Sequence, residues 1–125
     1  MSKKTFSGEY DVDGLRVGLR VPVYLWKEEN LVYAMSPALD ITGYGYTEEE
    51  AQKSFEVMME EFVSYTHRKK TIYKVLEGLG WTTNKKKKRV AAPLMEDLLR
   101  DNEELRNILK RPGVKQYDQE LALAL

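Results

Sequence analysis

The stretch that decides the fold is SPALDITGYGYTEEEA, residues 36–51. Its first half alternates between apolar and polar residues, with Leu39 and Ile41 on the apolar side, as in a half-buried strand. Its second half starts a helix, because Thr47 is a favourable N-cap and Glu50, three residues later, completes a capping box. The stretch therefore predicts a buried strand that enters an amphipathic helix almost without a loop.

A glycine marks the turn between this strand and this helix. Gly45 lacks a Cβ atom and can therefore adopt positive φ angles that are closed to other residues. We expect it to do so, and to let the chain turn sharply just ahead of Thr47.

Two further strands are predicted upstream. Residues 15–26 alternate strictly between apolar and polar positions, which indicates a long half-buried strand. Pro22 lies within it and cannot donate to a strand ladder, so we expect a free edge or a bulge nearby. Residues 31–35 are apolar on both faces and read as a central strand. With residues 39–44 as the third strand, the short connections predict an antiparallel meander.

The rest of the chain reads mainly as helix. Residues 48–66 form the predicted main helix, whose apolar stripe is Ala51, Phe55, Met58, Met59, Phe62 and Val63. A shorter helix over 71–79, a fourth strand over 81–90 and a third helix between Pro93 and Pro112 follow. The predicted fold is α+β: a three- to four-stranded antiparallel sheet packed on one face by an amphipathic helix. Residues 1–90 are expected to form this domain and residues 91–125 a helical C-terminal extension.

Composition narrows the function classes. The 125 residues suffice for one domain and a tail, and 42% are hydrophobic. Twenty basic and twenty acidic residues cancel, which argues against nucleic-acid or membrane binding by the chain as a whole. Without cysteine, and with His67 as the single histidine, no zinc site of the usual ligands can form, and we expect no cofactor. The absence of cysteine and of apolar runs predicts a cytoplasmic protein without a membrane span.

The central stretch resembles the core of the HicB-like antitoxin family, in which a Pro-x-Leu strand runs into Gly-x-Thr and a Glu-Glu-Ala helix start. The matching positions are Pro37, Leu39, Gly45, Thr47, Glu49, Glu50 and Ala51. The residue between the glycine and Thr47 is usually Asp in that family and is Tyr46 here. The segment 71–81 is similar to the Thr…Leu…Leu-Gly-Trp block of some members. The resemblance implies a β-β-β-α core related to part of the RNase H fold.

The resemblance also implies a function. HicB-like antitoxins belong to type II toxin–antitoxin systems, where they bind a small basic ribonuclease toxin and block it sterically, without chemistry of their own. Family members commonly carry a C-terminal operator-binding segment. Residues 91–125 show no basic strand followed by two short helices, so autoregulatory DNA binding stays open. The expected protein is therefore an antitoxin and not an enzyme.

Two alternatives remain. The chain could be a stand-alone oligomeric adaptor, because Pro22 and the alternating Leu and Ala residues of the tail 114–125 suggest a homo-oligomer. The opposing explanation is that the tail folds back over its own sheet. The chain could also be an RNase H-like metal-dependent nuclease, which needs several converging carboxylates. Asp40 is a lone acid on the third strand, so this reading is the weakest.

Two groups of residues are candidates for binding. Tyr24, Trp26, Tyr44 and Tyr46 lie on the face opposite the predicted core or in the loop beside it, and such residues are enriched at binding surfaces. The second helix, over 71–79, or the tail of the same chain could instead cover them. The run Lys85, Lys86, Lys87, Lys88 and Arg89 could contact nucleic-acid phosphates or could be a solvated loop. No aromatic residue interleaves with it, which removes the signature of single-strand binding.

Overall fold

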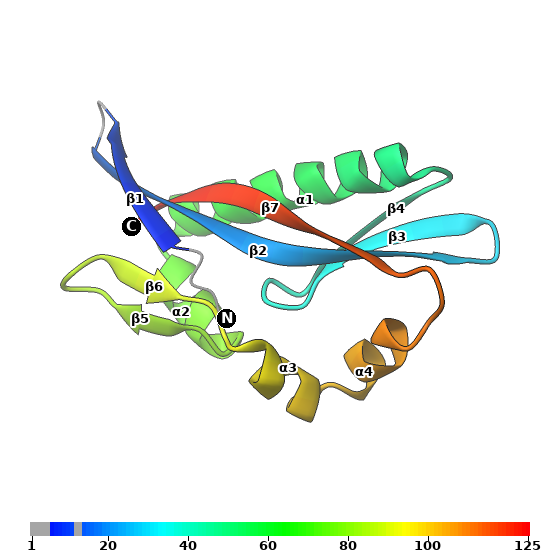
Figure 1. Ribbon diagram of the computed structural model, residues 1–125. Helices are drawn as coiled ribbons and strands as arrows, with labels where there is room; N and C mark the ends of the chain where they lie inside the picture. The colour runs from blue at the N-terminus through cyan, green and yellow to red at the C-terminus, as the bar shows by residue number, and fades with distance from the viewer. Residues whose placement is uncertain (1–5, 12–13) are drawn as a thin grey trace.

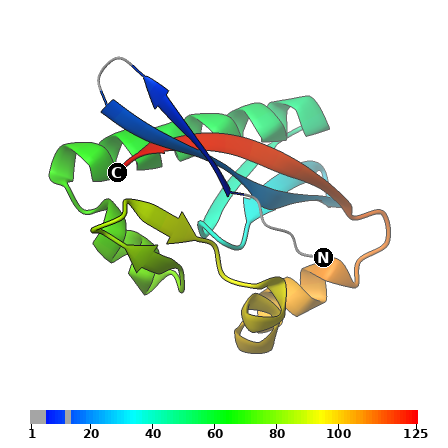
Figure 2. The same cartoon turned by 60° about the vertical axis from the view of Figure 1, so that its left-hand side comes forward.

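The computed structural model describes residues 6–11 and 14–125, with side chains from Val17 onward. The fold is α+β, as predicted, and its arrangement is shown in Figures 1 and 2. The strands are β1 (Phe6–Asp11), β2 (Gly14–Glu28), β3 (Leu31–Ser36), β4 (Ile41–Gly45), β5 (Thr82–Asn84), β6 (Arg89–Ala91) and β7 (Lys115–Ala124). The helices are α1 (Glu48–Lys69), α2 (Ile72–Gly78), α3 (Met95–Asp101) and α4 (Glu103–Leu109).

The long strand β2 organises a five-stranded sheet in which every pairing is antiparallel. β7 pairs with residues 16–25 of β2 along one edge. The pairing partners of β1 and β3 overlap with those of β7, so both must lie on the opposite edge of β2. β4 then pairs with β3. Figure 1 shows β7 running beside β2 across the sheet.

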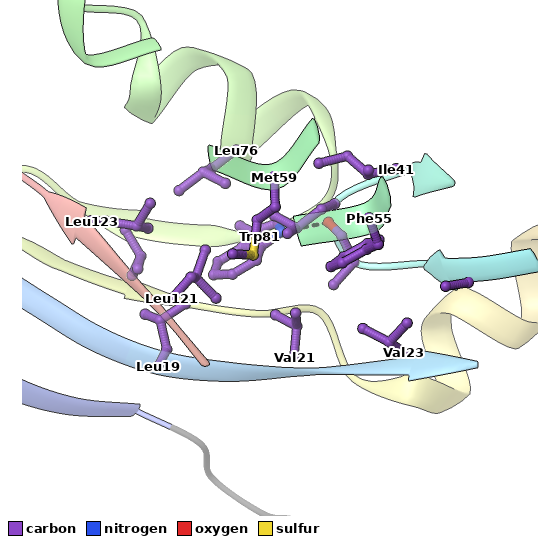
Figure 3. Packing of buried hydrophobic residues seen from close by; sticks show 14 of the residues in the cluster. Leu19, Val21, Val23, Ile41, Phe55, Met59, Leu76, Trp81, Leu121 and Leu123 are labelled. Carbon is purple, nitrogen blue, oxygen red and sulfur yellow. Dashed lines mark hydrogen bonds between the residues drawn. The ribbon is translucent and has the colours of Figure 1, made fainter. Parts of the chain in front are cut away.

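One face of this sheet holds the main core. Val21 and Val23 of β2 meet Phe55 of α1, Leu76 of α2 and Leu123 of β7, and all five side chains are buried (Figure 3). Trp81 closes this core, and its Nε1 donates a hydrogen bond to the carbonyl of Ala38 at 2.8 Å. Trp81 therefore fastens the segment after α2 to the turn before β4. Met58, which the apolar stripe included, is 44% exposed, whereas Thr66 is buried. The inward face of α1 is thus rotated slightly from the prediction.

Two glycines allow α1 to lie directly against β4. A Cβ atom on Gly43 would sit 2.3 Å from the backbone nitrogen of Phe55, and one on Gly45 would sit 2.5 Å from the Cβ of Glu50. The positive φ expected at Gly45 is wrong, because the described glycines with positive φ are Gly80 and Gly113. Gly45 belongs to the strand itself. Its hydrogen side chain serves close packing and not a turn.

The opposite face carries a second, smaller core at one end of the sheet. Tyr24, Trp26 and Met35 are buried there against Leu105 and Ile108 of α4. The single third helix predicted after Pro93 is in fact two helices that meet at an extended residue, Asn102. Its side-chain oxygen accepts a hydrogen bond from the backbone of Leu105 at 2.9 Å and caps α4.

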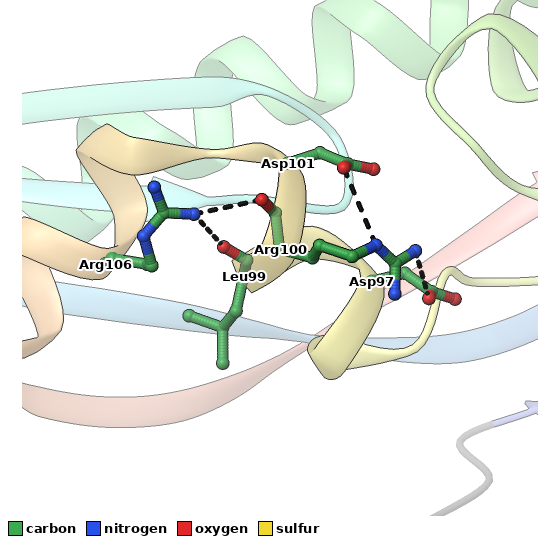
Figure 4. A network of polar contacts seen from close by, with 5 residues as sticks. All are labelled: Asp97, Leu99, Arg100, Asp101 and Arg106. Atoms are coloured by element: carbon green, nitrogen blue, oxygen red, sulfur yellow. Dashed lines mark hydrogen bonds and ion pairs between the residues drawn. The ribbon is translucent and has the colours of Figure 1, made fainter.

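The junction between α3 and α4 is closed by arginines. Arg106 of α4 donates to the carbonyls of Leu99 and Arg100, at 2.5 and 3.0 Å, and so satisfies acceptors at the end of α3 (Figure 4). Arg100 in turn forms an ion pair with Asp97 at 2.7 Å. These contacts fix the angle at which α4 approaches the sheet.

Two further expectations differ from the structure. Residues 81–90 form a hairpin of two short strands and not one strand, because the lysine run makes a turn. The extension 91–125 is not wholly helical, since it ends in the strand β7. The tail therefore folds back onto its own sheet. The expectation of a free apolar tail, which was one reason to expect an oligomer, is therefore wrong. Pro22, the other reason, is matched in register with Asp118 of β7.

Candidate partner-binding surface

An aromatic row crosses three strands on the α4 side of the sheet. Trp26 stands opposite Tyr33, and Tyr33 stands opposite Tyr44. The first two rings are stacked, with centroids 5.2 Å apart, and the second pair is tilted at 6.4 Å. Exposure rises along the row, from 9% at Trp26 to 60% at Tyr44. Cross-strand aromatic pairs stabilise a sheet, so the row gives the exposed Tyr44 a firm base.

The inner half of the predicted aromatic group is covered by the chain itself. Tyr24 and Trp26 lie beneath α3 and α4, and not beneath the helix over 71–79 or the tail, which were the expected covers. The Tyr24 hydroxyl points to the sulfur of Met95 at 4.0 Å, and burial, with a smaller effect from Asp118, raises the pKa of Tyr24. Tyr33 joins the group although sequence reasoning missed it, because only the strand register reveals its neighbours.

The outer half is exposed and rigidly mounted. Tyr46 is 74% exposed, and its backbone N–H donates to the carboxylate of Glu50 at 2.8 Å. The Glu50 N–H donates to the Thr47 hydroxyl at 3.0 Å, which confirms the predicted N-cap. The backbone of Tyr44 donates to the Ser54 hydroxyl at 3.2 Å. These bonds hold the backbone under both rings before any partner arrives, which lowers the entropic cost of binding.

Acidic residues follow these two tyrosines in the chain. Glu48 and Glu49 occupy the first turn of α1, next to Tyr46 in the chain and exposed. Lys115 neutralises Glu48 with an ion pair at 2.8 Å. Glu49 has no ion pair with any residue whose side chain is described, so it leaves negative charge at the surface. Tyr44, Tyr46, Glu48 and Glu49 are called the tyrosine–acid surface below.

Other predicted residues lie elsewhere. Lys85–Arg89 are all exposed around the β5–β6 turn, which lies at the end of the molecule opposite the start of α1 (Figure 1). His67 is exposed in the last turn of α1 and lines an open groove of about 470 Å³ between α1 and β7. Pro37 and Ala51 are buried, in keeping with a structural role.

Metal-ligating side chains do not gather near these surfaces in the described part of the chain. Among the side chains that the structure describes, from Val17 onward, no three His, Asp or Glu residues lie together in a way that could hold a metal ion. Asp40, expected on the third strand over 39–44, lies instead in the turn before β4, exposed and with a φ of 57°, because β4 begins only at Ile41. No helix within the same ranges has the length and apolar character to cross a membrane. Comparison with protein-family models, with curated proteins and with solved structures finds no match in any of the three.

Proposed function

We propose that this chain is a protein-binding module that acts by covering its partner. More specifically, it is proposed to be a HicB-like antitoxin that neutralises a small basic ribonuclease toxin. The observation that carries the proposal is the tyrosine–acid surface, in which Tyr44 and Tyr46 are exposed on a fixed backbone beside acidic residues. The order of strands and the Thr47-capped helix, which follow the family resemblance, support it further.

The chemistry of this surface suits a basic folded protein. Tyrosine rings supply large contact area with little loss of side-chain freedom, and they often dominate binding energy. The carboxylate of Glu49, which no described side chain neutralises, would attract a positively charged partner and speed the encounter. Inhibition then requires only that the bound chain obstruct the toxin's RNA-binding site. No proton transfer or metal is needed on this side of the complex.

A reconstituted pair tests the proposal. The chain is mixed with the purified product of an adjacent gene that encodes a small basic protein with a catalytic histidine, and cleavage of RNA is followed. The unaltered chain should abolish cleavage at about equal concentration. Replacing both rings, Tyr44→Ala with Tyr46→Ala, should weaken inhibition at least tenfold, because each hot-spot residue typically contributes about 2 kcal/mol or more.

Tyr65→Ala is the matched control, since Tyr65 is another exposed tyrosine and lies on the far half of α1. It should inhibit as well as the unaltered chain. Equal inhibition by the double variant and the control would refute the assigned surface. Failure of the unaltered chain to inhibit would refute the antitoxin function itself.

A stand-alone oligomeric adaptor remains the second candidate, because one observation favours it. In the described part of the chain β7 pairs only with β2, so its outer edge is free, and the groove beside it is lined by Met59, Val63 and Leu121. Free strand edges are templates for pairing with another strand. Light scattering should then show a dimer that Ala122→Lys, at the groove, dissociates. A monomer at tens of micromolar would contradict this candidate.

A further inference from the structure

Positive charge gathers at the end of the molecule opposite the tyrosine–acid surface. Residues 66–90 contain nine Lys and Arg residues and a single acid, Glu77, a net charge of +8 in a chain that is neutral overall. The remaining residues therefore carry −8. The nine residues, called the basic surface below, are Arg68, Lys69, Lys70, Lys74, Lys85, Lys86, Lys87, Lys88 and Arg89.

Three elements bring these residues together. The last turn of α1 leads through Lys70, in a left-handed conformation, straight into α2. The hairpin β5–β6 then returns along α2, and the Thr83 hydroxyl bonds to the carboxylate of Glu77. The Lys85 Nζ lies 5.8 Å from the centre of the Tyr73 ring on α2. Figures 1 and 2 both place the end of α1 and the hairpin turn at the same end of the molecule.

The charge of the basic surface is not neutralised within the protein. Among the described side chains, none of the nine residues forms an ion pair, and the one nearby acid is bonded to Thr83. Elsewhere several cations are paired, among them Arg20 with Glu120, Arg111 with Glu28 and Lys115 with Glu48. Clustered cations without ion-pair partners can neutralise the phosphates of a polyanion, and the release of the counterions condensed on that polyanion then favours binding.

The shape of the basic surface favours a duplex over a single strand. Its most prominent part is the two-stranded hairpin, whose turn points away from the body in Figure 1 and carries four exposed lysines. Two strands about 5 Å apart fit within the major groove, which is about 12 Å wide in B-DNA. Single-strand binders stack bases on exposed aromatic rings. The hairpin has no aromatic residue, and Trp81 just before it is buried.

We propose that the basic surface binds duplex nucleic acid through its phosphates, independently of base sequence. The hairpin turn enters a groove, while Arg68 and Lys69 contact the adjacent phosphate backbone. The centre of the neighbouring Tyr65 ring lies 5.8 Å from the Arg68 guanidinium and 5.9 Å from the Lys69 Nζ, so both cations flank the same ring. The inference goes beyond the toxin-binding proposal and does not depend on it, because the two surfaces lie at opposite ends.

The test uses the full chain and fluorescence anisotropy with labelled duplex DNA of mixed sequence. At about 50 mM salt we expect micromolar binding, with a steep loss of affinity towards about 200 mM. The variant Lys86→Gln with Lys87→Gln removes two turn lysines and leaves Lys88, with its positive φ, intact. It should lower the slope of log K against log salt by about two. A second duplex of different sequence should give the same affinities.

The control Lys53→Gln with Lys110→Gln makes the same change in net charge at exposed positions outside the basic surface. It should leave the slope unchanged. Absence of duplex binding at low salt, or an equal effect of the control, would overturn the proposal. So would tighter binding to a single strand, or to vesicles containing phosphatidylserine, because either would point to a different ligand for these cations.

Discussion

The two ends of the molecule differ in sign of charge and in how that charge is held. At the tyrosine–acid end, Glu48 is paired with Lys115, and hydrogen bonds fix the backbone below two exposed rings. At the basic end, nine cations have no ion pair among the described side chains. The first arrangement suits one partner of defined shape, and the second suits a repeating anion. A net charge of zero thus conceals two surfaces with different requirements.

The largest expected effect is a loss of overall stability, which would disrupt both surfaces together. Phe55 is fully buried where α1, β4 and the core meet, so Phe55→Ala should reduce the free energy of unfolding by about 3–5 kcal/mol. Chemical denaturation followed by tryptophan fluorescence measures this loss. Met58→Ala, on the exposed side of the same helix, should cost far less. Similar losses for the two variants would show that the inward face of α1 is assigned wrongly.

A smaller loss of stability should affect one end of the molecule more than the other. The Gly43→Ala variant places a methyl group against the backbone of Phe55 and pushes α1 away from β4, at a cost of about 1–3 kcal/mol. Gly78→Ala is the control, because nothing lies within 4 Å of its added methyl group. Hydrogen exchange should show faster opening around Tyr44 than in the β5–β6 hairpin. Uniform loosening of both would mean that the ends are not independent.

The Thr47→Ala variant confines the change to the tyrosine–acid end. The hydroxyl of Thr47 accepts a hydrogen bond from the N–H of Glu50, in the first turn of α1, so its loss should cost about 1 kcal/mol. Thermal unfolding measures the loss, and duplex binding at the basic end should remain as in the unaltered chain. A Thr47→Ser variant retains the hydroxyl and should recover most of the stability. Failure of serine to recover it would remove the capping explanation.

The strand β7, which runs between the two ends, gives a pH-dependent effect. Burial, with a smaller effect from Glu56, raises the pKa of Tyr117 from 10.0 to about 12. A raised pKa in the folded state means that the stabilisation is complete below pH 10.0 and is lost as the pH rises through about 12. The Tyr117→Phe variant should therefore lose less stability between these two pH values than the unaltered chain. Tyr46→Phe, at an exposed position, should behave as the unaltered chain does.

The last expected outcome is the absence of nuclease activity. Neither end brings together the carboxylates that two-metal cleavage requires, so we expect no degradation of RNA or DNA with added magnesium or manganese. Gel analysis of both substrates with the purified chain makes the measurement, and Asp40→Asn serves as the matched variant. Cleavage that disappears in Asp40→Asn would contradict the steric mechanism.

Local sequence signals predicted the parts of the fold that depend on nearby residues. Periodicity located β2, β3 and α1, and the spacing of Thr47 and Glu50 located the helix start. These signals failed where contacts between segments distant in the sequence determine the structure. The alternating Leu and Ala residues of the tail are typical of a strand, but no local sequence signal identifies β2 as the strand with which it pairs. The role of Gly45 likewise depends on how closely α1 approaches.

The residues of the candidate surfaces likewise divide into those that the sequence predicted correctly and those whose placement depends on tertiary packing. Tyr44 and Tyr46 were identified from the sequence, because their exposure follows from strand alternation and from the loop. Tyr24 and Trp26 share that pattern and yet are buried, since α4 packs there only after the chain has broken at Asn102. The lysine run was identified from the sequence. That it lies at the same end of the molecule as Arg68 and Lys74 was not predicted, because this depends on the turn between α1 and α2.

The pairing of β2 with β7 also sets the order in which the protein can fold. Paired residues along this ladder are separated by 90 positions at Leu25 and Lys115 and by 108 at Arg16 and Ala124. Closing so long a loop costs entropy before the contacts repay it, and such distant pairings slow folding. Helix α1 and the β2–β3 hairpin can form early, whereas β2 keeps one edge open until the last strand arrives. During that interval the open edge can recruit strands from other molecules, so refolding yield should fall as protein concentration rises.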